Sequence, residues 1–137
     1  MAENSSFDVI VIGGGPGGYV AAIRAAQLGK STAVVEKDKA GGRCLNYACI
    51  PAKTMLHTAE VLDEAKNSAE IGVKVTGAEL DWDALGQRRT DVSASLEGGV
   101  NGLFKKNKIE FIAGEGSLTE DGNVKVGDTT YQAGKVI

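Results

Sequence analysis

Both cysteines of the 137-residue chain, Cys44 and Cys49, lie in one short stretch, residues 41–56. Four residues separate the two thiols, so a coiled backbone between them would allow a small, reducible disulfide. Pro51 predicts a helix start, which would place Cys49 at a helix N-terminus, where the dipole stabilises a thiolate. The stretch therefore predicts a redox-active thiol pair, with Lys53 as a nearby positive charge.

Three other interpretations of the cysteines remain open. In the first, both cysteines are buried, free thiols, and the glycine pair before them, Gly41 and Gly42, is there by coincidence. A zinc site needs about four ligands, and His57 is the only histidine. A structural disulfide would require an oxidising compartment. The polar N-terminus shows no secretory signal, which favours a cytoplasmic location instead.

Length and composition restrict the classes of protein to consider. The chain is long enough for one domain with a hydrophobic core, and its hydrophobic share of 42% is ordinary. A net charge of −3 gives no electrostatic reason to expect nucleic acid. The apolar runs are too short to span a bilayer.

A glycine-rich segment, residues 13–18, precedes the cysteines and sits inside a βαβ pattern. The β-branched residues 7–12 predict a strand buried on both faces, and a helix is expected to begin near Pro16 and to be capped by Gly29. Residues 32–36 predict a second strand that ends in an acid. This order is typical of a dinucleotide-binding unit.

Each part of that unit has a physical role in holding a dinucleotide. Gly13 permits the tight turn, Gly15 lets the backbone approach a pyrophosphate, and Gly18 lets the helix pack closely on the strand. Glu36 is placed to accept hydrogen bonds from a ribose. The alternative is a glycine-rich turn in an unrelated α/β domain.

The remaining sequence predicts a helix over 51 to about 69, a possible short strand at 73–75, and a helix over 82–104 with Asp81 as its N-cap. Strands are expected at 109–113, 124–126 and 129–132, and another apolar run begins at residue 134. The first helix is indicated by residues near helical spacing: Ala52, Met55, Leu56, Ala59 and Leu62. The expected core positions of the second helix are Trp82, Leu85, Val92, Leu96 and Leu103.

Residues 41–53, GGRCLNYACIPAK, resemble the active-site motif GGTCxNxGCxPSK of the class I FAD-dependent pyridine-nucleotide disulfide oxidoreductases. Leu45 and Ile50 make the motif most similar to the dihydrolipoamide dehydrogenase branch, since glutathione and mercuric reductases tend to carry valine there. The resemblance implies an α/β fold: a Rossmann-like FAD-binding domain over 1–137, with a parallel sheet and an antiparallel β-meander, truncated at the C-terminus and lacking the NAD, central and dimerisation domains.

The resemblance also implies roles for single residues. Cys49 would be the thiol nearest the flavin and would form the charge-transfer thiolate, and Cys44 would be the interchange thiol that attacks the dithiol substrate. Lys53 would lie near the flavin N5, and Gly114 near the adenine. The full cofactor-binding set would be Gly13, Gly15, Gly18, Glu36, Lys37, Gly41, Gly42, Arg43, Cys44, Lys53 and Gly114.

Tightly bound FAD, NAD as co-substrate of the full-length enzyme, and a homodimer follow from the same resemblance. The expected reaction passes electrons from dihydrolipoamide, carried on a 2-oxo acid dehydrogenase complex, to the disulfide, to FAD and then to NAD. A glutathione- or mercuric-reductase-like flavoprotein and a non-catalytic nucleotide-binding module are the alternatives. The 137 residues alone are expected to be almost inactive, because the NAD site and the family's C-terminal His-Glu pair are missing, and His57 is a poor substitute.

Three residues depart from the family motif. Arg43, Ala48 and Ala52 stand where the motif has threonine, glycine and serine. None of these departures removes a redox group. Arg43 would either add a charge contact to the pyrophosphate or point to solvent, and Ala48 raises the question of whether the loop needs a positive φ at that position.

Overall fold

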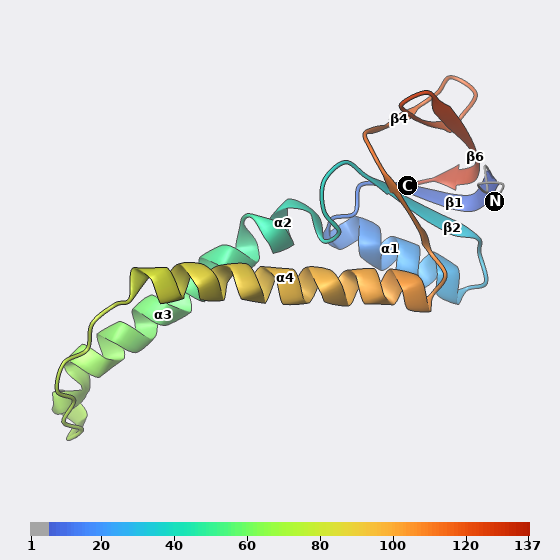
Figure 1. Cartoon of the computed structure of the whole chain (residues 1–137). Coiled ribbons are helices and arrows are strands. Elements are labelled where there is room, and N and C mark those ends of the chain that lie inside the picture. Colours follow the sequence, from blue (N-terminus) through green and yellow to red (C-terminus); the bar gives the residue numbers. More distant parts are fainter. Residues whose placement is uncertain (1–5) are drawn as a thin grey trace.

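The computed structural model describes residues 6–137, which form a layered α/β unit and a hairpin of two long helices that projects from it (Figure 1). In chain order the elements are β1 (Ser6–Ile12), α1 (Pro16–Gln27), β2 (Thr32–Glu36), α2 (Gly42–Asn46), α3 (Cys49–Asn67), the 3₁₀ helix η1 (Ser68–Ile71), α4 (Trp82–Lys106), β3 (Glu110–Ala113), β4 (Gly116–Leu118), β5 (Val124–Val126) and β6 (Thr129–Val136).

The strands of the described chain form one sheet with the order β3-β2-β1-β6-β5-β4. Strands β3, β2, β1 and the second half of β6 pair in parallel, whereas β4, β5 and the first half of β6 pair antiparallel. The predicted fold class, a parallel sheet with an antiparallel meander, is therefore confirmed. The two kinds of pairing meet within the single strand β6.

Two hydrophobic clusters lie on opposite faces of the parallel strands, as expected for strands that are covered on both sides. Helices α1, α2 and the C-terminal part of α4 cover one face, and the buried residues of that cluster are Val9, Val11, Ala22, Val34, Ala40, Leu45, Val100, Phe104 and Ile109. The meander covers the other face, with Phe7, Ile10, Ala33, Val35, Ile112, Val124 and Tyr131. This packing fixes the ends of β1 and β2 from both sides.

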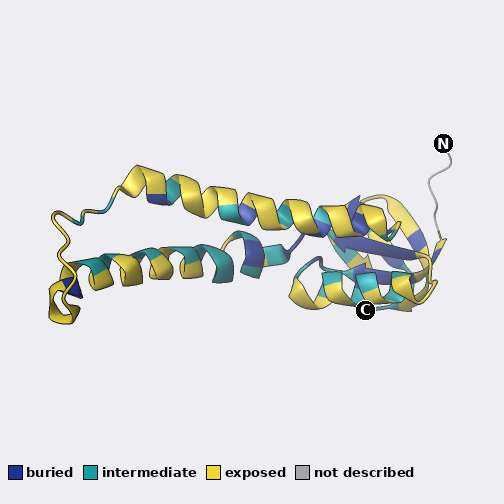
Figure 2. Ribbon diagram, turned by 90° about the horizontal axis from the view of Figure 1, so that it is seen from below, coloured by how far each residue is buried: buried dark blue, intermediate teal, exposed yellow. Residues whose placement is uncertain are grey.

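The helical hairpin of α3 and α4 is mostly exposed (Figure 2). No residue of α3 is buried, and α4 buries a stripe of four residues: Leu85, Ser93, Val100 and Phe104. The core prediction for Leu85 is confirmed. The predictions for Trp82, Leu96 and Leu103 are wrong, with exposed fractions of 70%, 43% and 42%, because the stripe of α4 that meets other elements is rotated away from them.

On α3, the residues at helical spacing are mostly exposed: Ala52, Met55, Leu56 and Ala59 are exposed and Leu62 is half-buried. On α4, the expected core residue Val92 is half-buried. The physical reason is that α3 packs against α4 alone over most of its length, so most of its surface has no neighbour (Figure 2). Helical spacing therefore identified the helix, although it did not predict which faces would be covered.

Several element boundaries differ from the sequence prediction. Residues 73–75 form no strand but part of the irregular connection to α4. Helix α3 begins at Cys49, before the proline, because proline is tolerated in the first turn of a helix. Helix α4 continues through its three glycines to Lys106, since packing of its C-terminal part on the sheet offsets their poor helix propensity.

The meander also differs in detail. The predicted strand at 129–132 and the apolar run from residue 134 are one strand, β6, which is paired with β5 at its start and with β1 at its end. Strand β4 (Gly116–Leu118) was not predicted, because its three residues give no periodic signal. Asp81 is the N-cap of α4 as predicted: its side chain accepts a hydrogen bond from the Ala84 N–H at 2.9 Å.

Candidate functional site

The loop between β1 and α1 has the backbone geometry that its glycines predict. Gly13 has a φ of +103°, and its N–H donates to the carbonyl of Val35 at 2.7 Å, which ties the loop to β2. A Cβ on Gly18 would overlap the carbonyl oxygen of Gly13, so only glycine fits there. A Cβ on Gly15 would meet nothing within 4 Å. The loop is therefore tight on its inner side and open where Gly15 lies.

Helix α1 starts at this open position without a side-chain cap. Pro16 occupies its first turn, and that turn contains no acidic residue. The first N–H groups of the helix and the positive end of its dipole therefore have no anionic side chain of the same turn beside them. An anion next to Gly15 would be bound favourably by this helix end.

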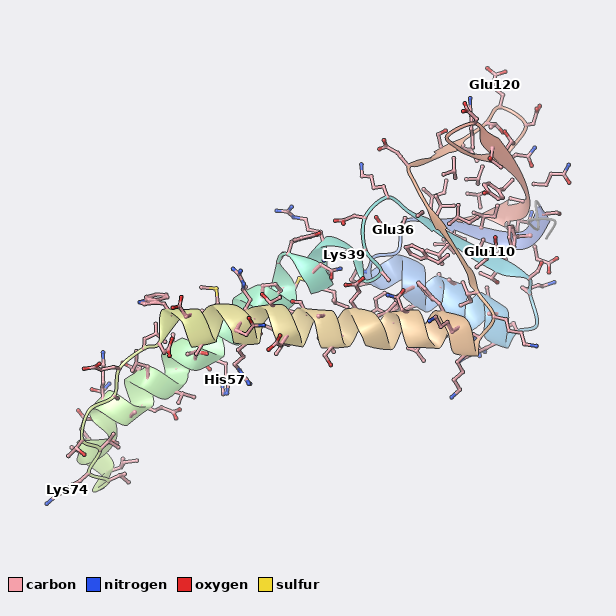
Figure 3. The ribbon with its side chains drawn as sticks, viewed as in Figure 1. Glu36, Lys39, His57, Lys74, Glu110 and Glu120 are labelled. Atoms are coloured by element: carbon pink, nitrogen blue, oxygen red, sulfur yellow. A yellow bond between two sulfur atoms is a disulfide. The ribbon has the colours of Figure 1, made fainter. Side chains whose placement is uncertain are left out.

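Glu36, the last residue of β2, holds the glycine-rich loop in place. Its Oε2 accepts a hydrogen bond from the Gly14 N–H at 2.8 Å, and its Oε1 accepts one from the Asp38 N–H at 3.0 Å. Its carbonyl accepts from the Gly114 N–H at 3.0 Å. Figure 3 shows Glu36 near the start of α1. Glu36, the residue predicted to bind a ribose, therefore lies at the mouth of the loop, and two hydrogen bonds hold its carboxylate in one orientation.

A cavity of about 240 Å³ opens beside Glu36, at the ends of β1 and β2. Its lining consists of Ile12, Gly13, Val35, Glu36, Lys37, Gly114, Glu115 and Gly116. The Lys37 ammonium and the Glu115 carboxylate form an exposed ion pair of 2.9 Å at this cavity, which raises the pKa of Lys37 and lowers the pKa of Glu115. Gly114 has a φ of +148°, and a Cβ there would come within 2.5 Å of Val126.

The two glycines before the cysteines allow the start of α2 to pack directly against the glycine-rich loop. The Gly41 N–H donates to the Gly14 carbonyl at 2.8 Å, and Gly41 has a φ of +92°. Gly42 has a φ of +61°, and a Cβ on it would lie 2.7 Å from the Cα of Gly15. The sequence stretch that carries the cysteines and the stretch that predicts dinucleotide binding are thus in direct contact.

Cys44 and Cys49 form a disulfide in the structure, with their Cα atoms 4.7 Å apart. Cys44 lies within α2 and Cys49 is the first residue of α3, so the break between the helices brings the sulfurs together. Ala48, in this break, has a φ of −127°, so the position needs no glycine. The amide of Asn46 donates to the carbonyls of Ala40 and Gly42, each at 3.0 Å, and holds α2 in place.

Lys53 lies on α3, one helical turn after Cys49. It lines a cavity of about 270 Å³ between α3 and α4, together with Ile50, Thr54, His57, Arg88, Val92 and Leu96. His57 is exposed and lies 3.8 Å from Glu60, as expected for a surface residue (Figure 3). This spacing along α3 is the basis for the prediction that Lys53 brings a positive charge close to the thiols.

Two residues at the site were missed by the sequence reasoning. Asn46 has a positioning role that its place in the family motif could have indicated. Glu115 forms the ion pair at the cavity, and no sequence signal identifies it, because its partner is 78 residues away. Within residues 6–137, no three His, Cys, Asp or Glu side chains gather as a metal site would require. No helix in that described part has the length and apolarity needed to cross a bilayer.

The chain is similar to known proteins over most of its length. The family described as pyridine nucleotide-disulphide oxidoreductase matches residues 7–137. Over 131 residues the chain is 52% identical to the dihydrolipoyl dehydrogenase of Rhizobium etli, covering 95% of this chain and 27% of that relative. It is 46% identical over 136 residues to the mitochondrial dihydrolipoyl dehydrogenase of Pisum sativum, covering 95% and 27%.

A third relative, the dihydrolipoyl dehydrogenase of Bacillus subtilis, is 49% identical over 114 residues, which cover 83% of this chain and 24% of the relative. The chain thus spans about a quarter of the length of the curated relatives it matches. The similarity extends over both the glycine-rich loop and the cysteine stretch.

Proposed function

The chain belongs to the pyridine nucleotide-disulphide oxidoreductase family, and from this premise we propose that residues 1–137 are the incomplete FAD-binding domain of a dihydrolipoyl dehydrogenase. The single observation that carries the proposal is the disulfide Cys44–Cys49. Cys44 comes two residues after Gly42, which packs against Gly15 of the glycine-rich loop. A reducible sulfur pair next to a nucleotide-type loop is the combination that electron transfer between a dithiol and a flavin requires.

The residues present fit FAD. The open space at Gly15 and the uncapped start of α1 suit a diphosphate. Glu36 has acceptor capacity left for a ribose, because each of its carboxylate oxygens accepts one hydrogen bond within the described part of the chain and has a second lone pair. The cavity beside Gly114 suits the adenine end. We assign the ADP part of FAD, with its diphosphate, to Gly13, Gly15, Gly18, Glu36, Lys37, Arg43 and Gly114, and the rest of FAD to Gly41, Gly42, Cys44 and Lys53.

The two cysteines have different roles in the proposed reaction. A thiolate of dihydrolipoamide attacks Sγ of Cys44, a mixed disulfide forms, and Cys49 leaves as a thiolate. The second substrate thiol, after losing its proton to a base, attacks the substrate sulfur of the mixed disulfide, so that lipoamide forms and Cys44 leaves as a thiolate. The substrate has lost two electrons and the cysteine pair has gained them.

The position of Cys49 at the start of α3 stabilises the thiolate that this exchange releases, because the positive end of the helix dipole lies there. Asn46 holds α2, and with it Cys44, against the loop. A bound flavin would accept the two electrons and pass them to NAD. The break between α2 and α3 keeps the two sulfurs within bonding distance, so the disulfide can form again after each cycle.

The proposal extends to the parts of the protein that the relatives possess beyond this match. We infer NAD as the electron acceptor, a homodimer, delivery of dihydrolipoamide by a 2-oxo acid dehydrogenase complex, and a cytoplasmic location. A cytoplasmic location is consistent with a disulfide that serves as a redox centre rather than as a structural link. The 137 residues alone would bind FAD and exchange thiols but would not reduce NAD at an appreciable rate.

The test is a titration of the purified 137-residue chain with FAD, followed by flavin fluorescence and absorbance, and an anaerobic reaction with dihydrolipoamide. We expect saturable FAD binding and the appearance of two free thiols per chain. A chain that bound FAD but left its disulfide intact in excess dithiol would be a nucleotide-binding module. A chain that bound no FAD would contradict the proposal altogether.

A further inference from the structure

The cavity beside Glu36 that suits the adenine is crossed by an ion pair on its solvent side. Lys37 directly follows β2, Glu115 lies in the turn between β3 and β4, and the Lys37 ammonium is 2.9 Å from Oε1 of Glu115. Both side chains are exposed, by 66% and 77%, whereas Val35, which lines the same cavity, is buried. The pair therefore connects two walls of the cavity at its mouth rather than at its base.

The backbone that carries Glu115 is held closely on both sides. A Cβ on Gly114 would come within 2.5 Å of Val126, and a Cβ on Gly116 would come within 2.8 Å of Val35. Glycine is therefore required at both positions, and the turn packs directly on β2 and β5. Since its two neighbours are glycines, Glu115 carries the only side chain of residues 114–116, and it does so from a fixed backbone position.

Lys37 has two cavities within its reach. It lines the adenine cavity and also a second cavity of about 260 Å³, whose lining consists of Glu36, Lys37, Asp38, Gly42, Arg43 and Tyr47. Lys37 is the one cation that the described chain contributes to the adenine cavity. Its pairing with Glu115 raises the pKa of Lys37 and lowers the pKa of Glu115. Glu115 thus decides at which cavity the ammonium lies.

An apolar ring in the cavity would strengthen this pair. An exposed ion pair contributes little by itself, because water competes for both charges. A purine ring seated between the pair and the buried side chain of Val35 would displace part of that water, and the attraction between the charges would increase. The ligand and the ion pair that covers it would therefore stabilise each other.

We propose that Glu115 is a positioning residue of this chain, whose ion pair with Lys37 closes over the adenine end of the dinucleotide and slows its release. This inference rests on the proposed function, because it assumes adenine in the cavity. Glu115 is not among the cofactor-binding residues that the family motif implies, and it acts on the ligand through Lys37. Because the pair must open before the ligand leaves, the effect falls mainly on the dissociation rate.

The sign of the effect separates this role from general electrostatics. Glu115→Gln removes a negative charge near a site for an anionic dinucleotide, so long-range electrostatics alone predicts tighter binding. Loss of the ion pair predicts the opposite, because Lys37 is then free to leave the mouth of the cavity.

The experiment compares the 137-residue chain with Glu115→Gln. Release of FAD is followed by flavin fluorescence after addition of excess ADP, and adenosine affinity is measured by calorimetry. We expect Glu115→Gln to release FAD about fivefold faster and to bind adenosine about fivefold more weakly, the upper range for an exposed ion pair. Adenosine has no phosphate, so its weaker binding would not come from a changed repulsion of phosphates.

Salt concentration provides a second measurement, because exposed charges are screened by salt. Raising KCl from about 0.05 M to about 1 M should bring the FAD release rates of the two chains together. Urea denaturation without ligand should give almost equal stability for both, since an exposed ion pair contributes little to the free chain.

Glu120→Gln is the matched control. It removes the same charge from an exposed side chain in the turn between β4 and β5, far from Glu36 (Figure 3). Glu120 has no ion-pair partner among residues 6–137. Its variant should release FAD and bind adenosine as the unmodified chain does.

The outcomes separate the inference from the proposal beneath it. If the unmodified chain binds FAD and Glu115→Gln releases it at the same rate or more slowly, the inference is wrong and the proposed function stands. Faster release that persists at high salt, or that accompanies a marked loss of stability without ligand, would also overturn the inference, because the structure of the turn would then be the cause. If the unmodified chain binds neither FAD nor adenosine, the proposed function itself fails.

Discussion

The backbone N–H of Gly14 donates a 2.8 Å hydrogen bond to Oε2 of Glu36, a residue 22 positions later in the chain. The other carboxylate oxygen accepts the Asp38 N–H at 3.0 Å. One side chain at the end of β2 therefore sets the position of the glycine-rich loop and of the segment that leads to α2. A residue predicted as a cofactor ligand is also a structural link.

Glu36→Ala should consequently affect both stability and binding. Two backbone donors lose their acceptor, and since Glu36 is only half-buried and water can reach part of the site, we expect a loss of about 1 to 2 kcal/mol in the free energy of unfolding. Urea denaturation measures this loss, and FAD titration should show weakened binding. Glu36→Gln retains an acceptor oxygen and should lose less; equal stability of Glu36→Ala and the unmodified chain would contradict the prediction.

Gly42→Ala should destabilise the chain strongly. Gly42 has a φ of +61°, which disfavours a side chain, and the added Cβ would lie 2.7 Å from the Cα of Gly15. We expect a loss of about 2 kcal/mol or more in the free energy of unfolding. Thermal or urea denaturation measures it.

Gly98→Ala provides the opposite control on α4, where a Cβ would meet nothing within 4 Å. The same substitution in a helix should raise the free energy of unfolding by about 0.5 to 1 kcal/mol. If both alanine variants changed stability by the same amount, the contact between the loop and α2 would not be the cause.

The thiol exchange can be followed with single cysteine variants. The unmodified chain, treated with excess dihydrolipoamide and freed of it by gel filtration under anaerobic conditions, should present two thiols to a colorimetric reagent, against none before treatment. Cys44→Ser and Cys49→Ser should each present one thiol with or without the dithiol. Unchanged circular dichroism would show that both variants are folded, as expected for a cross-link that closes only a short loop.

The pH dependence of stability should have a component from Asp8. Its carboxylate accepts hydrogen bonds from the backbone N–H of Ser31 at 2.9 Å and from the Ser31 hydroxyl at 3.0 Å, and these bonds lower the pKa of Asp8 below its usual value. A lowered pKa stabilises the folded chain at pH values above the unfolded pKa of about 3.9. This contribution is lost as the pH falls through the folded-state pKa.

Urea denaturation of the unmodified chain and of Asp8→Asn across the acid range measures this effect. The difference in free energy of unfolding should be constant at neutral pH and should shrink below about pH 4. A difference that stayed the same down to the acid limit would show that the carboxylate charge is not involved.

Ser93→Ala should leave stability unchanged or raise it. The Ser93 hydroxyl is buried in α4 and has no hydrogen-bond partner in the described part of the chain. Removal of an unsatisfied buried polar atom carries no loss of a hydrogen bond, and alanine has the better helix propensity. Thermal denaturation measures the change, and a marked drop in melting temperature would point to a partner for this hydroxyl.

The sequence predicted the βαβ unit well because its signals are local. A β-branched run, three glycines at fixed spacing and a terminal acid each act within a few residues, and the structure confirms the strands and α1 that they predict. The disulfide was predicted for the same reason, since Cys44 and Cys49 are five positions apart. Local chemistry, in other words, was readable from the residues alone.

The parts that were not predicted depend on contacts between distant residues. The exposure of Trp82 follows from how α3 and α4 pack, and helical spacing does not reveal which face of a helix finds a neighbour. The partnership of Glu115 with Lys37 depends on the turn between β3 and β4. The single strand β6 looked like two because its partner changes midway from β5 to β1.

That change of partner in β6 has a consequence for how the chain acquires its structure during synthesis. Strand β1 is made first, yet one of its two neighbours is formed by residues near 132–136, so its hydrogen-bonding edge stays bare until they emerge from the ribosome. A nascent chain would carry an unpaired, apolar edge until those residues have been made, which invites wrong pairing between copies and slows folding. Completion of the parallel sheet around β1 should therefore wait for β6, although β1 and β2 can pair much earlier.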